Sequence, residues 1–227
     1  MAEGVKRRYD NTRRQQQARD NRRRIIAAAT ELFAGHGYAG TTFADVAERA
    51  GVAVQTVYAA FGNKVTLLKQ AIDVALAGDD EPVPLAQRQP ARNVAAEADP
   101  YRIVQMYAAQ VKAILSRAAG VLFAAWAAAP GDPEVAALVD DLDAQRLQGM
   151  TAAAAGLATK ARQSGTLAAG VTEEEIRDTL WALNSAPVYR LLLHDRGWTP
   201  EHLEQWLVRT WTSLFLRPQP AAPPKQP

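Results

Sequence analysis

Cysteine is absent from this sequence of 227 residues, and histidine and methionine occur only three times each. The lack of cysteine excludes a disulfide framework, a thiolate metal site and a cysteine nucleophile. His36 has no second histidine near it, and His194 and His202 lie far along the chain. We therefore predict neither a metal site nor a cofactor.

Long apolar runs are also missing. No stretch of 18 consecutive apolar residues occurs, and the N-terminal segment is charged and polar without the apolar core of a signal sequence. A membrane-spanning helix and secretion are therefore not expected. The corresponding expectation is a cytoplasmic protein.

The motifs that mark most enzymes are lacking as well. The sequence has no nucleophile elbow, phosphate-binding loop, metal cluster or Cys/His pair. Asp140, Asp141 and Asp143 are best explained as one exposed acidic face of a helix. We predict no catalytic residues, and only turnover of a bound ligand would revive an enzymatic hypothesis.

The charge of the chain is unevenly distributed, although its net value is only +2. Residues 1–24 hold nine basic and three acidic side chains, an excess of six positive charges, so the remainder carries a net charge of −4. A basic arm joined to a small helical domain is typical of a nucleic-acid-binding protein. The arm would neutralise phosphates or enter the minor groove, unless it is only a solvated tail.

The segment Thr41–Leu68 predicts a helix-turn-helix. Thr42 and Asp45 can form a reciprocal cap for a helix over Phe43–Ala50, and Gly51 suits a turn that requires positive φ. A second helix, Val54–Phe61, would place its outer face in the major groove of DNA. Within it, Val57 and Phe61 are expected in the core.

This segment resembles the DNA-binding domain of the TetR family of transcriptional regulators. The resemblance covers about the first third of the chain and includes Ile25, Ile26, Ala29, Leu32, Phe33, Gly37, Tyr38, Thr41, Thr42, Val46, Ala47, Ala50, Gly51, Val52, Thr56, Val57, Tyr58, Phe61, Lys64, Leu67 and Leu68. Ala53 departs from the family, which commonly has Ser or Thr at this cap, and Ala59 and Ala60 replace larger residues. We therefore expect DNA recognition that depends partly on DNA shape and thymine methyl groups.

The candidate DNA-contacting residues are Arg22, Thr42, Val54, Gln55, Thr56, Tyr58, Ala59 and Lys64. Gln55 could bond an adenine edge, and Val54, Ala59 and the Thr56 methyl could pack on thymine methyls. Tyr58 and Lys64 are better suited to phosphates.

The predicted fold is all-α, with a three-helix DNA-binding domain followed by a larger helical domain for ligand binding and dimerisation. Helical spacing recurs over Tyr101–Arg117, Ala118–Ala129, Pro133–Ser164, Thr172–Asp195 and Glu201–Leu216, and Pro187 is expected to kink the fourth of these. The predicted divisions are a disordered arm (1–20), the helix-turn-helix domain (21–68), a linking helix with a mobile connection (69–99), the larger domain (100–216) and a disordered tail (217–227).

The resemblance implies a homodimer formed by the last two helices and a small-molecule effector that is not identified. Candidate ligand-lining residues, each also compatible with plain packing, are Tyr107, Phe123, Trp126, Met150, Trp181 and Asn184. They suggest an apolar or aromatic ligand. The predicted protein is a repressor that binds a palindromic operator in double-stranded DNA and is released by its ligand; an activator or a ligand-independent architectural regulator is the alternative.

Overall fold

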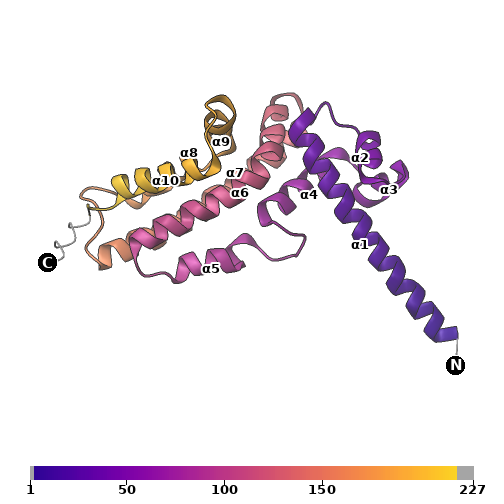
Figure 1. Cartoon of the computed structure of the whole chain (residues 1–227), viewed down its shortest axis with the longest axis horizontal. Helices are drawn as coiled ribbons and strands as arrows, with labels where there is room; N and C mark the ends of the chain where they lie inside the picture. The colour runs from indigo at the N-terminus through magenta and orange to yellow at the C-terminus, as the bar shows by residue number, and fades with distance from the viewer. Residues whose placement is uncertain (1–2, 219–227) are drawn as a thin grey trace, which may run out of the picture. The chain divides into compact units, whose positions relative to one another are not determined.

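The fold of the described residues is all-α, as predicted (Figure 1). The computed structural model describes the backbone of residues 3–218 and the side chains of residues 13–218. Within this part of the chain, the only extended pairing is the single bridge between Leu167 and Leu216. The chain divides into two compact units, one containing the residues up to 82 together with 117–142, and the other containing 83–116 together with the residues from 143 onward.

The first unit contains the four N-terminal helices. They are α1 (Glu3–His36), α2 (Phe43–Ala50), α3 (Val54–Phe61) and α4 (Lys64–Ala77). Apolar residues at helical spacing face inward and are almost fully buried in each helix, for example Ile25, Phe33, Val46, Val57 and Leu68. Helix α1 packs against both α2 and α4, and α2 packs against α3, so one small core fixes the three-dimensional relation of these helices.

The start of α1 differs from the prediction. Residues 3–20 were expected to be disordered, whereas the helix begins at Glu3. Ala, Arg and Gln favour helix, and two side-chain hydrogen bonds at i,i+4 spacing, Gln16 to Asp20 and Gln17 to Asn21, support the exposed stretch.

The first unit also contains the corner between two long helices, α6 (Pro100–Ala128) and α7 (Pro133–Gln163), joined by the turn η2 (Ala129–Gly131). Arg117 of α6 donates to the carbonyl oxygens of Ala75 and Leu76 and so caps the end of α4. Gly120 lies so close to α1 that an added Cβ would be 2.7 Å from the Cβ of Ala34. The corner of residues 117–142 thus belongs to the same compact unit as α1–α4.

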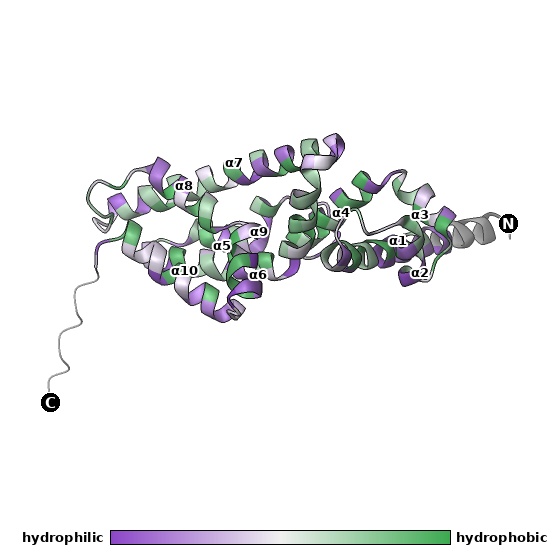
Figure 2. Cartoon of the chain, turned by 90° about the horizontal axis from the view of Figure 1, so that it is seen from above, coloured by the Kyte–Doolittle hydropathy of each residue, from purple (hydrophilic) through white to green (hydrophobic). Residues whose placement is uncertain are grey.

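The second unit contains η1 (Leu85–Gln87), α5 (Gln89–Ala96), α8 (Glu173–Leu183), α9 (Ala186–Arg190), the π-helical turn η3 (Leu191–Asp195) and α10 (Pro200–Phe215), together with the remaining halves of α6 and α7. Its core includes Val104, Leu157, Ile176, Leu207 and Trp211. Polar and apolar residues alternate in short groups along α7, as expected for a helix with one buried face (Figure 2).

Three element boundaries in this unit differ from the prediction. The connection after α4 contains α5, whose last turn is capped by Lys160, which donates to the carbonyl oxygens of Ala95 and Glu97. The two helices expected between Tyr101 and Ala129 are one helix, α6. Pro187 does not kink a long helix, because α8 ends at Leu183 and Pro187 lies in the first turn of α9, where its missing N–H costs nothing.

Arg217, at the start of the predicted tail, is ordered. Its backbone N–H donates to Thr166, its guanidinium donates to Leu167, and its carbonyl accepts from the Tyr101 hydroxyl. Residues 219–227 of the predicted tail lie outside the described residues.

The segment Pro100–Gly131 is long and apolar enough to cross a membrane by length and composition alone. Its buried positions, however, recur at helical spacing, as Val104, Ala108, Val111 and Leu115 show. Lys112 forms ion pairs with Glu201 and Glu204. These contacts are those of an interior helix that packs against protein.

Candidate nucleic-acid interface

The helix-turn-helix is fixed by local hydrogen bonds at both ends of α2. The Thr42 hydroxyl accepts from the Asp45 amide at 3.2 Å, and the Asp45 carboxylate accepts from the Thr42 amide at 2.8 Å. The Thr42 hydroxyl also donates to the Asp45 carboxylate at 2.7 Å, and this bond, followed by the one from the Thr42 amide, holds the pKa of Asp45 below its ordinary value. At the other end Gly51 adopts φ 64°, and its N–H reaches the carbonyls of Ala47 and Glu48. The predicted cap and turn are therefore confirmed.

Helix α3 separates a buried face from an exposed one. Val57 and Phe61 are buried in the core, as predicted. The other face presents the predicted base-contacting residues to solvent: Gln55 and Ala59 are exposed, and Val54 and Thr56 are partly exposed. Ala53 makes no capping hydrogen bond, also as predicted. The exposed face of α3 is thus the candidate reading surface, the surface that would contact DNA bases, and the buried face anchors the helix in the core.

Tyr58 belongs to the same surface. Its side chain is 57% exposed, yet its ring packs edge-on against the buried Phe43 at a centroid distance of 4.7 Å. This contact restricts the ring while leaving the side chain accessible. A restricted aromatic side chain loses little conformational entropy when a partner binds.

Five of the described basic residues of α1 fall into two groups. Arg13, Arg14 and Arg19 are exposed. By contrast, Arg22 donates to Gln70 at 2.9 Å and lies over the Phe61 ring, and Arg23 forms a two-bond ion pair with Asp80. Arg22 and Arg23 thus tie α1 to α4 and to the residues that follow it, and a DNA contact by Arg22 stays a prediction.

Lys64 begins α4 but turns toward the loop between α1 and α2. Its ammonium donates to the carbonyl oxygens of Tyr38 at 3.0 Å and Thr41 at 3.2 Å. The Tyr38 phenol lies beside Asp132; burial and then this carboxylate raise the pKa of Tyr38 to about 12. The predicted phosphate contact of Lys64 is not tested by these bonds, but they give the side chain a second role.

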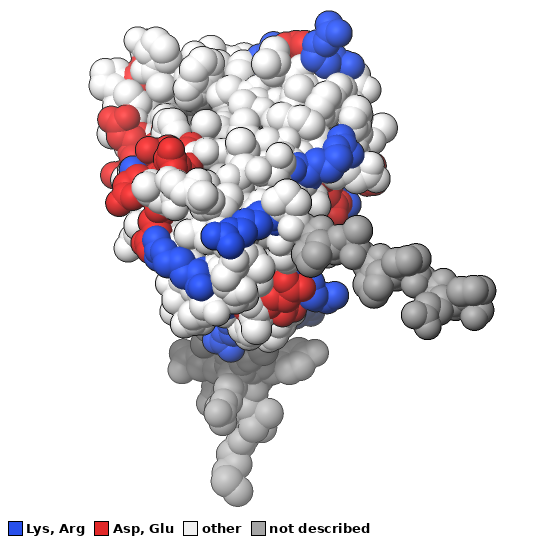
Figure 3. All heavy atoms as spheres, turned by 90° about the vertical axis from the view of Figure 1, so that its left-hand side faces the viewer, with Lys and Arg blue, Asp and Glu red and all other residues white. Residues whose placement is uncertain are grey.

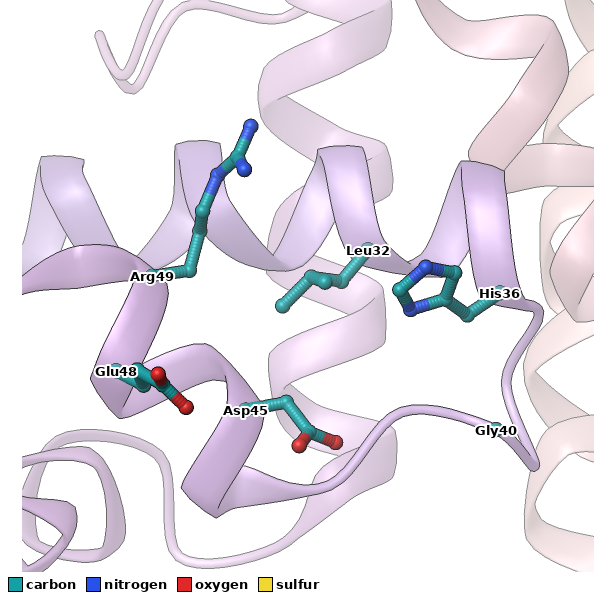
Figure 4. A pocket seen from close by; sticks show the side chains of 6 residues that line it. All are labelled: Leu32, His36, Gly40, Asp45, Glu48 and Arg49. Atoms are coloured by element: carbon teal, nitrogen blue, oxygen red, sulfur yellow. The ribbon is translucent and has the colours of Figure 1, made fainter.

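A hollow of about 350 Å³ lies between α1 and α2 and is lined by Leu32, His36, Gly40, Asp45, Glu48 and Arg49 (Figure 4). It is open to solvent, and its charges are mixed. At its rim Arg49 forms an ion pair with Glu31. The lining of the hollow is not predominantly apolar, unlike that of a typical ligand pocket. Among the described side chains, no group of three or more His, Cys, Asp or Glu residues could hold a metal ion.

The six predicted ligand-lining residues are divided between the two compact units. Phe123 and Trp126 belong to the first unit and contact each other at a centroid distance of 5.8 Å. Trp126 is 53% exposed. The other four, Tyr107, Met150, Trp181 and Asn184, belong to the second unit.

Arg146 connects several of these four residues, and it was not among the predicted site residues. Its guanidinium donates to the carbonyl oxygens of Trp181 at 2.7 Å and Asn184 at 2.9 Å, and lies over the Trp181 ring. Asn184 hydrogen-bonds Tyr107, whose pKa is raised because burial outweighs this bond and the nearby charge of Arg146. An arginine in the middle of α7, just before the Ala-rich stretch of that helix, was the available signal.

Trp211 of α10 also lies beside Tyr107, and it was not among the predicted ligand-lining residues. Its ring lies 5.6 Å from that of Tyr107 and is buried. Its indole N–H is the one buried side-chain N or O without a hydrogen-bond partner among the described residues. A buried donor of this kind favours an acceptor, because an unmade hydrogen bond is costly.

Comparisons with known proteins agree with this geometry. Residues 25–71 match the family model for bacterial regulatory proteins of the tetR family. The HTH-type transcriptional regulator TtgR of Pseudomonas putida is 41% identical over 61 residues, which are 27% of this chain and 29% of that protein. The chain thus matches less than a third of the length of this curated relative.

Solved structures show the same fold over most of the chain. NalD of Pseudomonas aeruginosa, the secondary repressor of the MexAB-OprM multidrug efflux pump, has a TM-score of 0.64 at 20% identity, covering 88% of this chain and 98% of that one. A transcriptional regulator from Saccharomonospora viridis in complex with choline has a TM-score of 0.66 at 19% identity, with 87% and 98% covered. FadR of Bacillus subtilis in complex with stearoyl-CoA has a TM-score of 0.64 at 18% identity, with 84% and 97% covered.

Proposed function

We propose that the protein is a ligand-responsive repressor of the TetR family that binds a palindromic operator as a homodimer, because residues 25–71 match the family model for bacterial regulatory proteins of the tetR family. The observation that carries this proposal is the two-sided α3. Val57 and Phe61 anchor one face, and the other face presents Gln55, Ala59 and Tyr58. This is the arrangement that places a helix in the major groove.

The charge distribution supports DNA as the partner. The exposed Arg13, Arg14 and Arg19 extend α1 beyond the three-helix core. On the face drawn in Figure 3, by contrast, acidic side chains gather along one edge and basic ones are scattered over a mostly uncharged surface. An arm of basic residues next to a recognition helix supplies the phosphate contacts that dominate affinity.

A homodimer follows from the size of the reading surface. One helix of eight residues contacts few bases, whereas two copies related by a two-fold axis read a palindrome. Trp181 of α8 and Leu214 of α10 are exposed apolar residues on the last long helices and are candidates for the interface. Sedimentation should then give twice the chain mass of 24.6 kDa.

The ligand would act by population shift. It must bind more tightly to the form of the protein that fits DNA poorly, since equal affinity for both forms changes nothing. The Tyr107, Asn184 and Trp211 cluster offers aromatic surface and one buried donor without a partner. We therefore propose a largely apolar ligand with a hydrogen-bond acceptor.

A gel-shift titration on DNA fragments that the protein itself retains tests the reading surface. Gln55→Ala should weaken binding by about fivefold to a hundredfold if Gln55 makes a bidentate base contact. Gln89→Ala, an exposed glutamine on α5, is the matched control and should bind as wild type does. Equal binding by both variants would remove Gln55 from the interface.

A further inference from the structure

The loop between α1 and α2 is unusually constrained. Gly37 adopts φ 74°, and a Cβ on Gly40 would lie 2.5 Å from the carbonyl oxygen of His36. Thr41 is fully buried, and its hydroxyl donates to the Gly37 carbonyl at 2.8 Å. The loop therefore has one compact conformation, and it delivers the chain directly to the cap of α2 at Thr42.

Lys64 holds this loop from outside. Two of the three N–H groups of the Lys64 ammonium can donate to the carbonyl oxygens of Tyr38 and Thr41. The Lys64 Nζ atom lies 4.2 Å from the centroid of the Tyr38 ring. The Tyr38 ring in turn stacks on the buried Phe33. The ammonium is thus surrounded by acceptors and a ring face that belong to the loop, which itself packs on α1.

The backbone of Lys64 is fixed as well. It is the first residue of α4, and the preceding Asn63 caps this helix by accepting from the Thr66 amide at 2.8 Å. The side chain of Lys64 therefore spans from an anchored helix start to two carbonyls of the loop. Such a bridge relates the start of α4 to the start of α2.

We propose that Lys64 is a positioning residue, which locks the loop of residues 37–41 onto α4 and thereby sets the N-terminus of α2 for DNA. This inference rests on the proposed function and names how one residue of that interface acts. In the alternative, Lys64 swings out and neutralises a phosphate. The two roles predict different effects of Lys64 on the salt dependence of DNA affinity, because only a phosphate contact releases a counterion.

The test compares Lys64→Gln with Lys69→Gln in the full-length chain. Lys69 lies on the same helix, is exposed and pairs with Asp73 at i,i+4 spacing, so its variant matches the lost charge. The DNA probe is a labelled duplex of the sequence that the wild-type protein retains, titrated between roughly 50 and 200 mM salt.

For a positioning residue, Lys64→Gln should bind the duplex about tenfold more weakly than Lys69→Gln, the loss typical of a charged hydrogen bond. The slope of log K against log salt should be the same for both. A slope that falls by about 0.9 per protomer for Lys64→Gln alone would establish the phosphate contact and overturn the proposal.

A second readout needs no DNA. Hydrogen exchange of the peptide covering residues 37–45 should be faster in Lys64→Gln than in the wild-type chain or Lys69→Gln, because the loop loses its clamp. Unchanged exchange would also overturn the proposal. If the wild-type protein retains no DNA, the proposed function fails, and this measurement still decides whether Lys64 holds the loop.

Discussion

Single side chains at the helix starts show how local chemistry organises the candidate interface. α2 begins with the reciprocal bonds between Thr42 and Asp45, whereas α3 begins at Ala53 without any side-chain cap. Both helices have only eight residues, so one satisfied amide is a large share of their local stabilisation. The N-terminal cap of α3, the candidate recognition helix, is thus weaker than that of α2.

This difference gives a paired prediction. Thr42→Ala should lower the free energy of unfolding by about 1 kcal/mol, because the Asp45 amide loses its acceptor. Ala53→Ser should raise it by about 0.5 to 1 kcal/mol, because the Ala53 backbone already has the extended conformation of a cap. Urea denaturation measures both changes, and the account of the caps is wrong if both variants unfold at the same urea concentration as the wild type.

The residues that the sequence located well are those with local partners. Thr42, Asp45 and Gly51 were assigned from spacing alone, because their hydrogen bonds reach at most four residues along the chain. Arg146 was missed, because its partners are about 35 residues away and are backbone carbonyls, which leave no trace in a sequence.

At the scale of elements, one turn of α6 approaches both α1 and α4 within the first unit. Gly120 allows the approach, since an added Cβ would lie 2.7 Å from the Cβ of Ala34, which has no flexible end that could move aside. Arg117, one turn earlier, bonds the end of α4. Two contacts from one turn of α6 therefore fix the corner of residues 117–142 to both α1 and α4.

Gly120→Ala should consequently fail to stabilise the protein. Alanine in place of glycine inside a helix normally adds about 1 kcal/mol, and Gly149→Ala, on α7 with open space around it, should show that gain. Gly120→Ala should be less stable than Gly149→Ala by more than about 1 kcal/mol, because the helices must separate. Thermal unfolding of each variant gives the comparison.

A compensating change sharpens this test. Ala34→Gly removes the atom that the new Cβ would strike, so it should restore part of the stability of Gly120→Ala after its own helix cost of about 1 kcal/mol is subtracted. Strictly additive effects of the two substitutions would mean that the two residues do not interact.

Element types were more predictable than element ends. Helical spacing located α2, α3 and α10 nearly to the residue, because each has one buried stripe. It did not show that α6 is continuous or that α8 stops at Leu183. Those boundaries depend on tertiary contacts, such as the bonds from Arg146 to the end of α8.

At the scale of the whole molecule, the sequence did not predict which helices belong to the same compact unit. The corner of residues 117–142 belongs to the unit that contains α1–α4, which also divides the predicted ligand-lining residues between two units. Periodicity reports which face of a helix is buried, but not which helix covers it. A common ligand lining formed by these residues therefore stays a prediction.

The basic arm gives a prediction at the same scale. Replacing Arg13, Arg14 and Arg19 by Gln should weaken DNA binding and reduce the salt slope by up to about 2.7 per protomer, about 0.9 for each lost phosphate contact. The preferred DNA sequence should stay the same, because phosphate contacts carry no base information. Binding isotherms at several salt concentrations measure the slope, and an unchanged slope would show that the arm does not contact DNA.

The central claim is that the protein reads DNA through α3 as a symmetric dimer. Its most direct test is selection from random or genomic DNA by the purified full-length protein at physiological salt, followed by sequencing of the retained fragments. The account predicts a palindrome whose half-sites are about one helical turn apart. Retention without any sequence preference would contradict it, because only the basic arm would then contact DNA.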